Sequence, residues 1–203
     1  AKKSPPKVEA HESAPTTLNS TIKKHDGAVI RALVAAEETY LNLNQKMNAL
    51  SEGLLDLRLP GPAAGAENVF STTVTTVDLD PVPAATPTDS SKLEAHPWPV
   101  AALSRQTEGV DLWRPMLDKI SYFEHAKVKL ISGGHPDENM WRYEAKGGFE
   151  ALARMKSDQW FSFEGRMDLT WERPKTDGGG AGEWKITGWK TTEMNWRTRP
   201  RRL

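Results

Sequence analysis

The stretch EWKITGWKTTEMNW, Glu183 to Trp196, places three tryptophans near the end of the chain and decides how the fold closes. Side chains alternate between the two faces of a β-strand, which puts Trp189 opposite the other two indoles. Either something covers the second face near Trp189, or Gly188 carries a bulge that turns this indole back. Strict alternation places Trp184, Ile186, Met194 and Trp196 on one face, and Thr187, Trp189 and Thr191 on the other.

Length and composition limit the function classes. The chain has 203 residues, 37% hydrophobic and 27% charged, which suffices for one core with tails. Lysine plus arginine (27) balance aspartate plus glutamate (27), so no net field attracts nucleic acid. The absence of cysteine excludes disulfides and cysteine metal sites, and no apolar run is long enough to span a bilayer. The sequence also contains no phosphate-binding loop, no dinucleotide fingerprint and no histidine pair at ligand spacing. We therefore expect no cofactor, no metal, no nucleic acid and no membrane span.

The region from Asp26 to Gly53 is predicted to be a helix, with these two residues as its caps. Hydrophobic residues recur within one wide arc at 100° per residue, and this arc is predicted to face the core. Glu37 and Asn44 fall inside the same arc, where polar groups need partners. The apolar members of the arc are Val29, Ile30, Leu33, Val34, Tyr40, Leu41 and Met47.

The remaining elements are predicted to be mostly strands. A single strand is expected at 68–80, where β-branched residues dominate. Prolines exclude regular structure through most of 80–100, and a short helix is expected around Pro115. Long alternating segments then predict an antiparallel meander that must curl to fit a small domain. Its strands are expected at 121–132, 140–155, 160–174 and 183–196, with bends or bulges at Gly147, Gly148, Gly165 and Gly188.

The two ends of the chain are predicted to lie outside the domain. Residues 1–17 are polar and contain prolines, which indicates a disordered or draped tail. Residues 197–203 include four arginines and read as a basic tail or a linker to a following domain. A single domain is therefore expected at 18–196.

The order of these elements, with the closing EWKITGW (183–189), resembles the nuclear-transport-factor-2-like superfamily, which includes SnoaL-like proteins. The resemblance implies an α+β fold in which a strongly curved antiparallel sheet wraps the amino-terminal helix as a cone (cystatin/SnoaL-like). More narrowly, DLWRPMLDKISYFEHAKVKLISG (111–133), ALARMKSDQW (151–160) and GEWKITGWKTTEM (182–194) are similar to the amino-terminal module of planctomycetal FG-GAP (integrin-alpha-like) and ASPIC/UnbV proteins. This implies a module of a larger, exported protein with an extracytoplasmic location.

The candidate pocket residues are polar side chains on the helix and on the first long strand, since enzymes on the resembled scaffold use polar groups inside the cone. Alternation places His125 opposite Tyr122 and Glu124, so histidine and carboxylate converge only if a bulge intervenes. Glu164 and Asp168, with Arg166 between them, are expected to form a solvated charge ladder. The pocket candidates are Glu37, Tyr40, Asn44, Tyr122, Glu124 and His125, and no residue is assigned a catalytic role.

Two functions stay open on the sequence. The first is a non-catalytic association module that forms a homodimer through an exposed sheet face bearing Trp189, Thr187 and Thr191. The second is a small-molecule binder, or an isomerase, dehydratase or hydrolase, that holds an apolar ligand in the cone. A buried pocket with converging carboxylate or histidine groups would favour the second, and a cone filled by its own side chains the first. Binding of nucleic acid through the basic tail is disfavoured by the charge balance.

Overall fold

The computed structural model describes residues 16–57, 69–81, 94–108, 112–136, 140–175 and 178–199. The chain forms two compact units, residues 1–38 and 39–203. Helix α1, Thr16–Leu55, begins in the first unit and ends in the second. Most of the predicted tail, residues 82–93 of the proline-rich segment and the last four residues lie outside the described residues.

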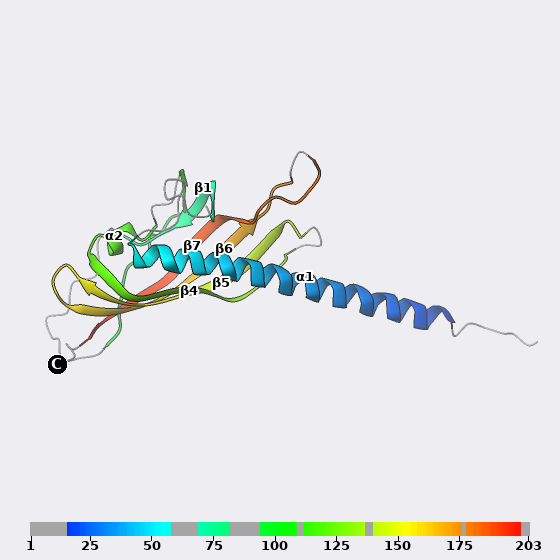
Figure 1. The fold of residues 1–203 in the computed structure, drawn as a ribbon, viewed down its shortest axis with the longest axis horizontal. Coiled ribbons are helices and arrows are strands. Elements are labelled where there is room, and N and C mark those ends of the chain that lie inside the picture. Colours follow the sequence, from blue (N-terminus) through cyan, green and yellow to red (C-terminus); the bar gives the residue numbers. More distant parts are fainter. Residues whose placement is uncertain are drawn as a thin grey trace, which may run out of the picture. The chain divides into compact units, whose positions relative to one another are not determined.

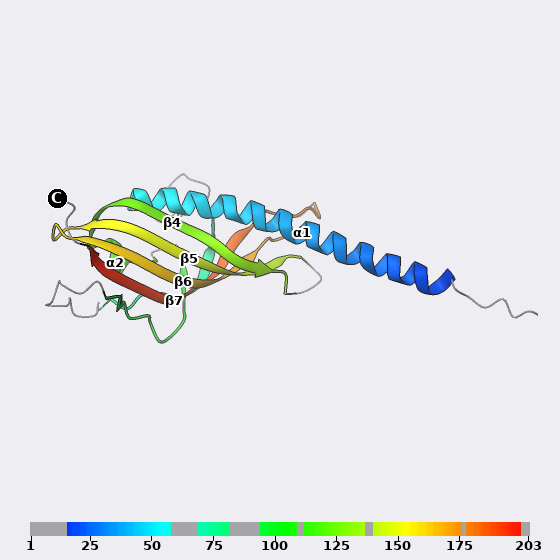
Figure 2. The same ribbon diagram turned by 90° about the horizontal axis from the view of Figure 1, so that it is seen from below.

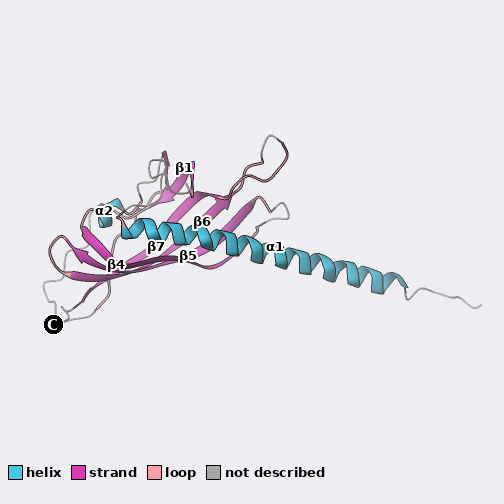
Figure 3. Ribbon diagram, viewed as in Figure 1, coloured by secondary structure: helices cyan, strands magenta, loops and turns pink. Residues whose placement is uncertain are grey.

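The second unit combines helices with a sheet of long strands (Figure 1, Figure 3). Within the described part of the chain, seven strands form one sheet in the order β3-β1-β7-β6-β5-β4, with β2 also paired to β7. The meander of long antiparallel strands is confirmed. After α1, the elements are β1 (Phe70–Val77), β2 (His96–Pro97), β3 (Arg105–Glu108), α2 (Arg114–Leu117), β4 (Ile120–Gly134), β5 (Arg142–Met155), β6 (Trp160–Glu172) and β7 (Lys185–Arg199).

Two details of the predicted fold need correction. Strand β1 pairs with β7 in parallel, so the sheet is mixed rather than wholly antiparallel. These strands are far apart in the chain, and no tight turn forces them to run in opposite directions. The helix predicted from Asp26 to Gly53 is also too short, because α1 runs from Thr16 to Leu55.

Residues 39–55 of α1 lie along β4, the edge strand of the sheet (Figure 2). The hydroxyl of Ser51 accepts a hydrogen bond from the amide of Val128 at 2.9 Å, and the hydroxyl of Tyr40 donates to the carbonyl of Leu130 at 3.2 Å. These side chains satisfy backbone groups that an edge strand would otherwise leave unpaired. The predicted packing of the helix against a curled sheet is thereby confirmed. None of the described helices is long and apolar enough to cross a membrane.

The helix face in contact with the sheet is narrower than predicted. The residues of α1 that pack against the sheet form a single buried seam, in which they recur at alternating steps of four and three residues. Tyr40 is half-buried at one end of this seam. A sheet edge covers one such seam rather than a wide arc, which leaves Leu41 exposed. The other exposed members of the predicted arc belong to the first unit, and the predicted burial is wrong for them too. The buried seam is Leu43, Met47, Leu50 and Leu54, whereas Val29, Ile30, Leu33, Val34 and Leu41 are exposed.

Bulges in β7 fix the position of Trp189. Thr170 pairs with Gly188 and Trp171 with Ile186, which leaves Thr187 without an opposite residue. One extra residue reverses the alternation, so Trp189 returns to the face of Trp184. A second shift leaves Thr192 unpaired and restores the phase for Met194 and Trp196. The bulge near Gly188 is confirmed. The buried face is Trp184, Ile186, Trp189, Thr191, Met194 and Trp196.

Candidate functional site

The space between the inner sheet face and α2 is filled by aromatic side chains. The indole of Trp113 lies 4.6 Å from the ring of Phe149 and 5.3 Å from that of Trp189, measured between ring centroids. Its Nε1 donates to Oγ1 of Thr191 at 3.0 Å. All four residues are buried. The prediction that Trp189 lies on an exposed face is wrong, since its side chain is 1% exposed, and Thr191 is equally buried.

A buried carboxylate holds Trp113 in this place. Trp113 has a φ of 56°, in the left-handed region that costs energy for a residue with a side chain. Oδ1 of Asp78 accepts hydrogen bonds from the amides of Trp113 at 3.0 Å and Leu79 at 2.7 Å. Arg105 lies 3.7 Å from the second oxygen of Asp78. This carboxylate therefore has a structural role, which stabilises the chain where Trp113 enters the core.

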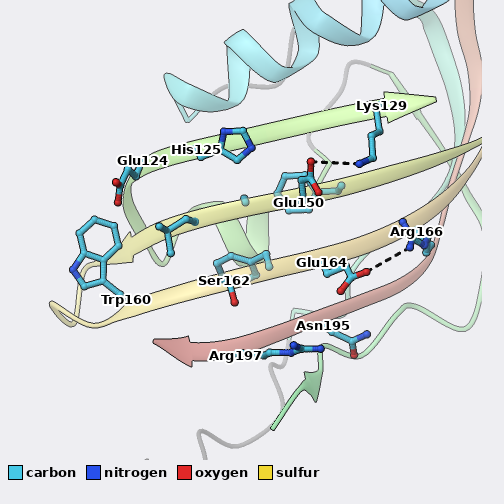
Figure 4. Close-up of a pocket in the computed structure, with 14 residues that line it drawn as sticks. Glu124, His125, Lys129, Glu150, Trp160, Ser162, Glu164, Arg166, Asn195 and Arg197 are labelled. Carbon is cyan, nitrogen blue, oxygen red and sulfur yellow. Dashed lines mark hydrogen bonds and ion pairs between the residues drawn. The ribbon is translucent and has the colours of Figure 1, made fainter. Parts of the chain in front are cut away.

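The opposite face of β4 to β7 carries a groove of about 1000 Å³. Its side chains come from all four strands and are mostly polar (Figure 4). Alternation directs the apolar residues of these strands inward, and charged residues are left for the outer face. The residues that line the groove include Glu124, His125, Lys129, Glu150, Leu152, Trp160, Ser162, Glu164, Arg166, Asn195 and Arg197.

A bulge in β4 brings Glu124 and His125 to the same groove. Phe123 pairs with Ala153 and His125 with Leu152, so Glu124 has no opposite residue on β5. The sequence predicted that Glu124 and His125 could converge only if a bulge lay between Tyr122 and His125. The structure contains this bulge, and both side chains line the groove. Tyr122, the third candidate on this strand, is not among the lining residues.

Tyr122 lies beside the groove instead. Its ring meets that of Trp160 edge to face at 5.7 Å between centroids. Two hydrogen bonds raise the pKa of Arg154 above its ordinary value; the larger contribution comes from Tyr122 and the smaller from Asp158. These contacts arrange the aromatic and basic groups at the β5–β6 end of the outer face.

Charged pairs occupy the middle of the groove. Lys129 Nζ lies 3.4 Å from Oε1 of Glu150, and Arg166 Nη2 lies 3.4 Å from Oε1 of Glu164. The second pair confirms the part of the charge ladder on β6 that joins Glu164 to Arg166. Glu150 and Glu164 are direct partners across β5 and β6, and like charges in this arrangement are destabilising unless cations lie nearby. The two ion pairs supply those cations.

One row of residues crosses all four strands of the groove. His125 pairs with Leu152, Leu152 with Ser162, and Ser162 with Arg197. His125 therefore lies at one end of the row, with Glu124 next to it in the chain, and Arg197 lies at the other end. Three strand spacings, or about 14 Å, separate the backbones of His125 and Arg197. Among the described residues, neither Glu124 nor Arg197 has an ion-pair partner within 4.0 Å. The groove thus presents an anionic and a cationic end.

None of the remaining predicted site residues is among those that line the groove. Glu37 is exposed on the first unit, Asn44 is half-buried, and Tyr40 is occupied by its bond to the carbonyl of Leu130. Thr187 is the half-buried bulge residue of β7. Within the described ranges, no cluster of three or more histidine, aspartate or glutamate side chains is arranged to hold a metal. Sequence reasoning missed Leu152, Trp160, Ser162 and Arg197, which only the strand register brings together.

Comparisons with known proteins do not assign this chain to a family. No protein-family model matches this sequence, and no curated protein matches it. A solved structure from Novosphingobium aromaticivorans, described as a "putative aromatic ring hydroxylase", is similar to this chain with 14% identity and a TM-score of 0.47. The similarity covers 80% of this chain and 94% of that one. No statement about function follows from a similarity of this size.

Proposed function

We propose that this chain is a non-catalytic binding module that holds a charged segment of a partner protein in the groove across β4 to β7. The observation that carries the proposal is the row from His125 to Arg197, which has the carboxylate of Glu124 beside one end and the guanidinium of Arg197 at the other. Complementary charges of this kind give specificity and fast association rather than chemistry.

The filled interior argues against an apolar ligand in the cone. Trp113, Phe149 and Trp189 occupy the space that such a ligand would need. Carboxylates that act in acid–base catalysis usually depend on burial, whereas Glu124, Glu150 and Glu164 are exposed. The position of the polar groups thus favours recognition over catalysis.

The partner segment is defined by the spacing of the two ends. A cationic side chain would lie against Glu124 and a carboxylate against Arg197, whose guanidinium binds carboxylates in a bidentate manner. A span of about 14 Å corresponds to about four residues of extended chain. Leu152 and Ser162 form the floor between the two ends, and Trp160 offers an aromatic contact at the side.

The family resemblance supports a wider setting for this module. Similarity of 111–133 and 182–194 to the amino-terminal part of FG-GAP and ASPIC/UnbV proteins favours one module of a larger, exported protein. Membership of the nuclear-transport-factor-2-like superfamily belongs to the same proposal, and the observed helix and curled mixed sheet support it.

The test uses synthetic peptides as probes. A peptide with lysine and glutamate four positions apart is expected to bind the protein, and binding should weaken as salt is raised. Glu124→Gln and Arg197→Gln should each reduce affinity about tenfold, since each removes the charge from one of the two charge-assisted contacts with the peptide. Calorimetric titration measures the effect.

Matched controls lie on the same sheet face outside the groove. Glu172→Gln and Lys190→Gln remove the same kinds of charge from exposed positions that do not line the groove. Binding of the peptide should be unchanged in both. Equal losses in groove and control variants, or equal binding of a peptide with both charges replaced by alanine, would refute the proposal.

A second candidate function rests on the bulge at Glu124. The bulge brings a carboxylate and an imidazole to one surface, an arrangement that also suits a small polar ligand. In that case His125→Asn would abolish binding of the ligand while Arg197→Gln would leave it unchanged. The peptide experiment, repeated on these two variants, separates the candidates.

A further inference from the structure

A row of aromatic and cationic side chains crosses the ends of three strands on the inner face of the sheet. The amide of Arg173 donates to the carbonyl of Trp141 at 3.0 Å, which continues the pairing of β6 with β5. Glu172 pairs with Lys185, so Trp184 lies beside Arg173 on the β7 side. Arg173 therefore lies between two tryptophans, and none of these three residues is among those that line the groove.

The guanidinium of Arg173 contacts both of these indoles. Its central carbon lies 5.3 Å from the ring centroid of Trp141 and 4.9 Å from that of Trp184. Lys175, two residues further along the chain, has its Nζ 5.2 Å from the ring centroid of Trp141. Indole faces attract cations, but they do not supply the hydrogen-bond acceptors that a guanidinium and an ammonium group require.

Two buried N–H groups in this cluster lack an acceptor. Nε1 of Trp171 and Nε of Arg173 are both buried, and neither has a hydrogen-bond partner among the described residues. The side chain of Trp171 is fully buried, and residues two apart on an extended chain lie on the same face. Both groups are donors, so the partner that would satisfy them is a hydrogen-bond acceptor.

The local charge favours an anion over a neutral acceptor. Among the described residues, no carboxylate lies within 4.0 Å of Arg173 or Lys175. Glu172 is exposed on the opposite face, and Glu183 is paired with Nζ of Lys185 at 3.2 Å. A water molecule would supply an acceptor, but it would leave the charge of the half-buried Arg173 uncompensated.

We propose that Trp141, Trp171, Arg173, Lys175 and Trp184 form a binding site for a small organic carboxylate. The carboxylate accepts hydrogen bonds from Arg173 and from Nε1 of Trp171, and Lys175 adds a second positive charge. A carboxylate is flat, as a guanidinium is, and therefore fits between two large indole rings. The additional oxygens of a phosphate would project from this plane toward the rings.

The aromatic part of the site is held in place by its neighbours. Trp184 is buried, and its ring centroid lies 5.9 Å from that of His135 and 6.5 Å from that of Tyr143. Nδ1 of His135 donates to the carbonyl of Arg142 at 2.8 Å, which fixes the imidazole in turn. A site that is ordered in advance loses little free energy to ordering when a ligand binds.

Titration with sodium acetate tests the site, with sodium chloride at the same ionic strength as the control. The indole N–H resonance of Trp171, assigned by its loss in Trp171→Phe, should shift saturably with acetate and stay unchanged with chloride. Arg173→Lys keeps the positive charge but loses the forked donors, and should weaken acetate binding about tenfold. Lys175→Gln, at an exposed position, should weaken it about threefold and leave the fold intact.

Matched controls remove positive charge from the outer face. Lys190→Gln and Arg197→Gln should leave the shift of the Trp171 resonance with acetate unchanged. An equal shift with chloride, or no shift in the folded protein, would overturn the anion site. Tighter binding of inorganic phosphate than of acetate at the same ionic strength would overturn the assignment to a carboxylate. The readout lies on the inner face, so the result does not depend on peptide binding in the groove.

Discussion

The two faces of the sheet formed by β4 to β7 use the same alternation for different purposes. The inner face presents Phe149, Phe163 and Leu169 to the core, and all three are buried. The outer face presents Glu150, Glu164 and other charged groups to solvent. Inner residues are fixed by the hydrophobic effect, which depends on the area removed from water. The positions of the outer residues relative to one another depend on the strand register. This register is determined by the packing of the inner face.

This difference predicts where substitutions will be costly. On the inner face each side chain has packed neighbours, so truncation leaves a cavity. On the outer face a truncated side chain is replaced by water. The stability of the fold is therefore expected to depend on the inner face, and recognition on the outer one.

The largest effect is expected for Trp113→Ala. This indole is fully buried against Phe149 and Trp189 and is hydrogen-bonded to Thr191. Its removal should lower the free energy of unfolding by about 3–5 kcal/mol. Denaturant titration of the variant, with an unchanged slope, measures this loss.

Trp160→Ala is the matched control on the outer face. Trp160 is half-buried beside Tyr122, and its removal should cost about 1 kcal/mol, mostly from the lost aromatic contact. Equal losses for the two tryptophans would contradict the distinction between the two faces.

A smaller effect is expected at the sheet edge, where the helix meets β4. Ser51→Ala removes the acceptor of the Val128 amide and should cost about 1–2 kcal/mol, since it leaves a buried backbone donor unpaired. Ser132→Ala, at an exposed position on the same strand, should change the free energy of unfolding by less than about 0.5 kcal/mol. Hydrogen exchange at the Val128 amide, faster in Ser51→Ala alone, would locate the effect. Protection that is unchanged would refute it.

Much of the fold followed from periodicity. The alternation of side chains correctly placed Phe161, Phe163 and Trp171 of β6 on one face, because the large apolar residues of this strand occur at every second position. Alternation failed on β7, where Thr187 and Thr192 each add one residue against β6. A bulge depends on both paired strands. The sequence of one strand therefore cannot reveal where it has one residue more than its partner.

The predictions for the helix and for the groove were incomplete for related reasons. The wide apolar arc of α1 was expected in the core, but the sheet covers only the seam that includes Met47 and Leu50. Glu124 and His125 were noticed together, and the bulge needed to join them was stated. Arg197 was not noticed, since it was assigned to a tail and meets the groove only through the pairing of β6 with β7. Long-range register is the information that composition and periodicity lack.

The smallest effect is expected for the charged pair at the centre of the outer face. Lys129 and Glu150 are both more than one-third exposed in their side chains, and 3.4 Å separates their charged atoms. Water and salt screen such a pair, so Lys129→Ala should change the free energy of unfolding by less than about 0.5 kcal/mol. A double-mutant cycle with Glu150→Ala should give a coupling energy in the same range, and the coupling should fall as salt is added. A coupling several times larger, or one that salt does not reduce, would mean that the outer face stabilises the fold as the inner face does. The sheet would then lose the division between stability and recognition on which the proposed function depends.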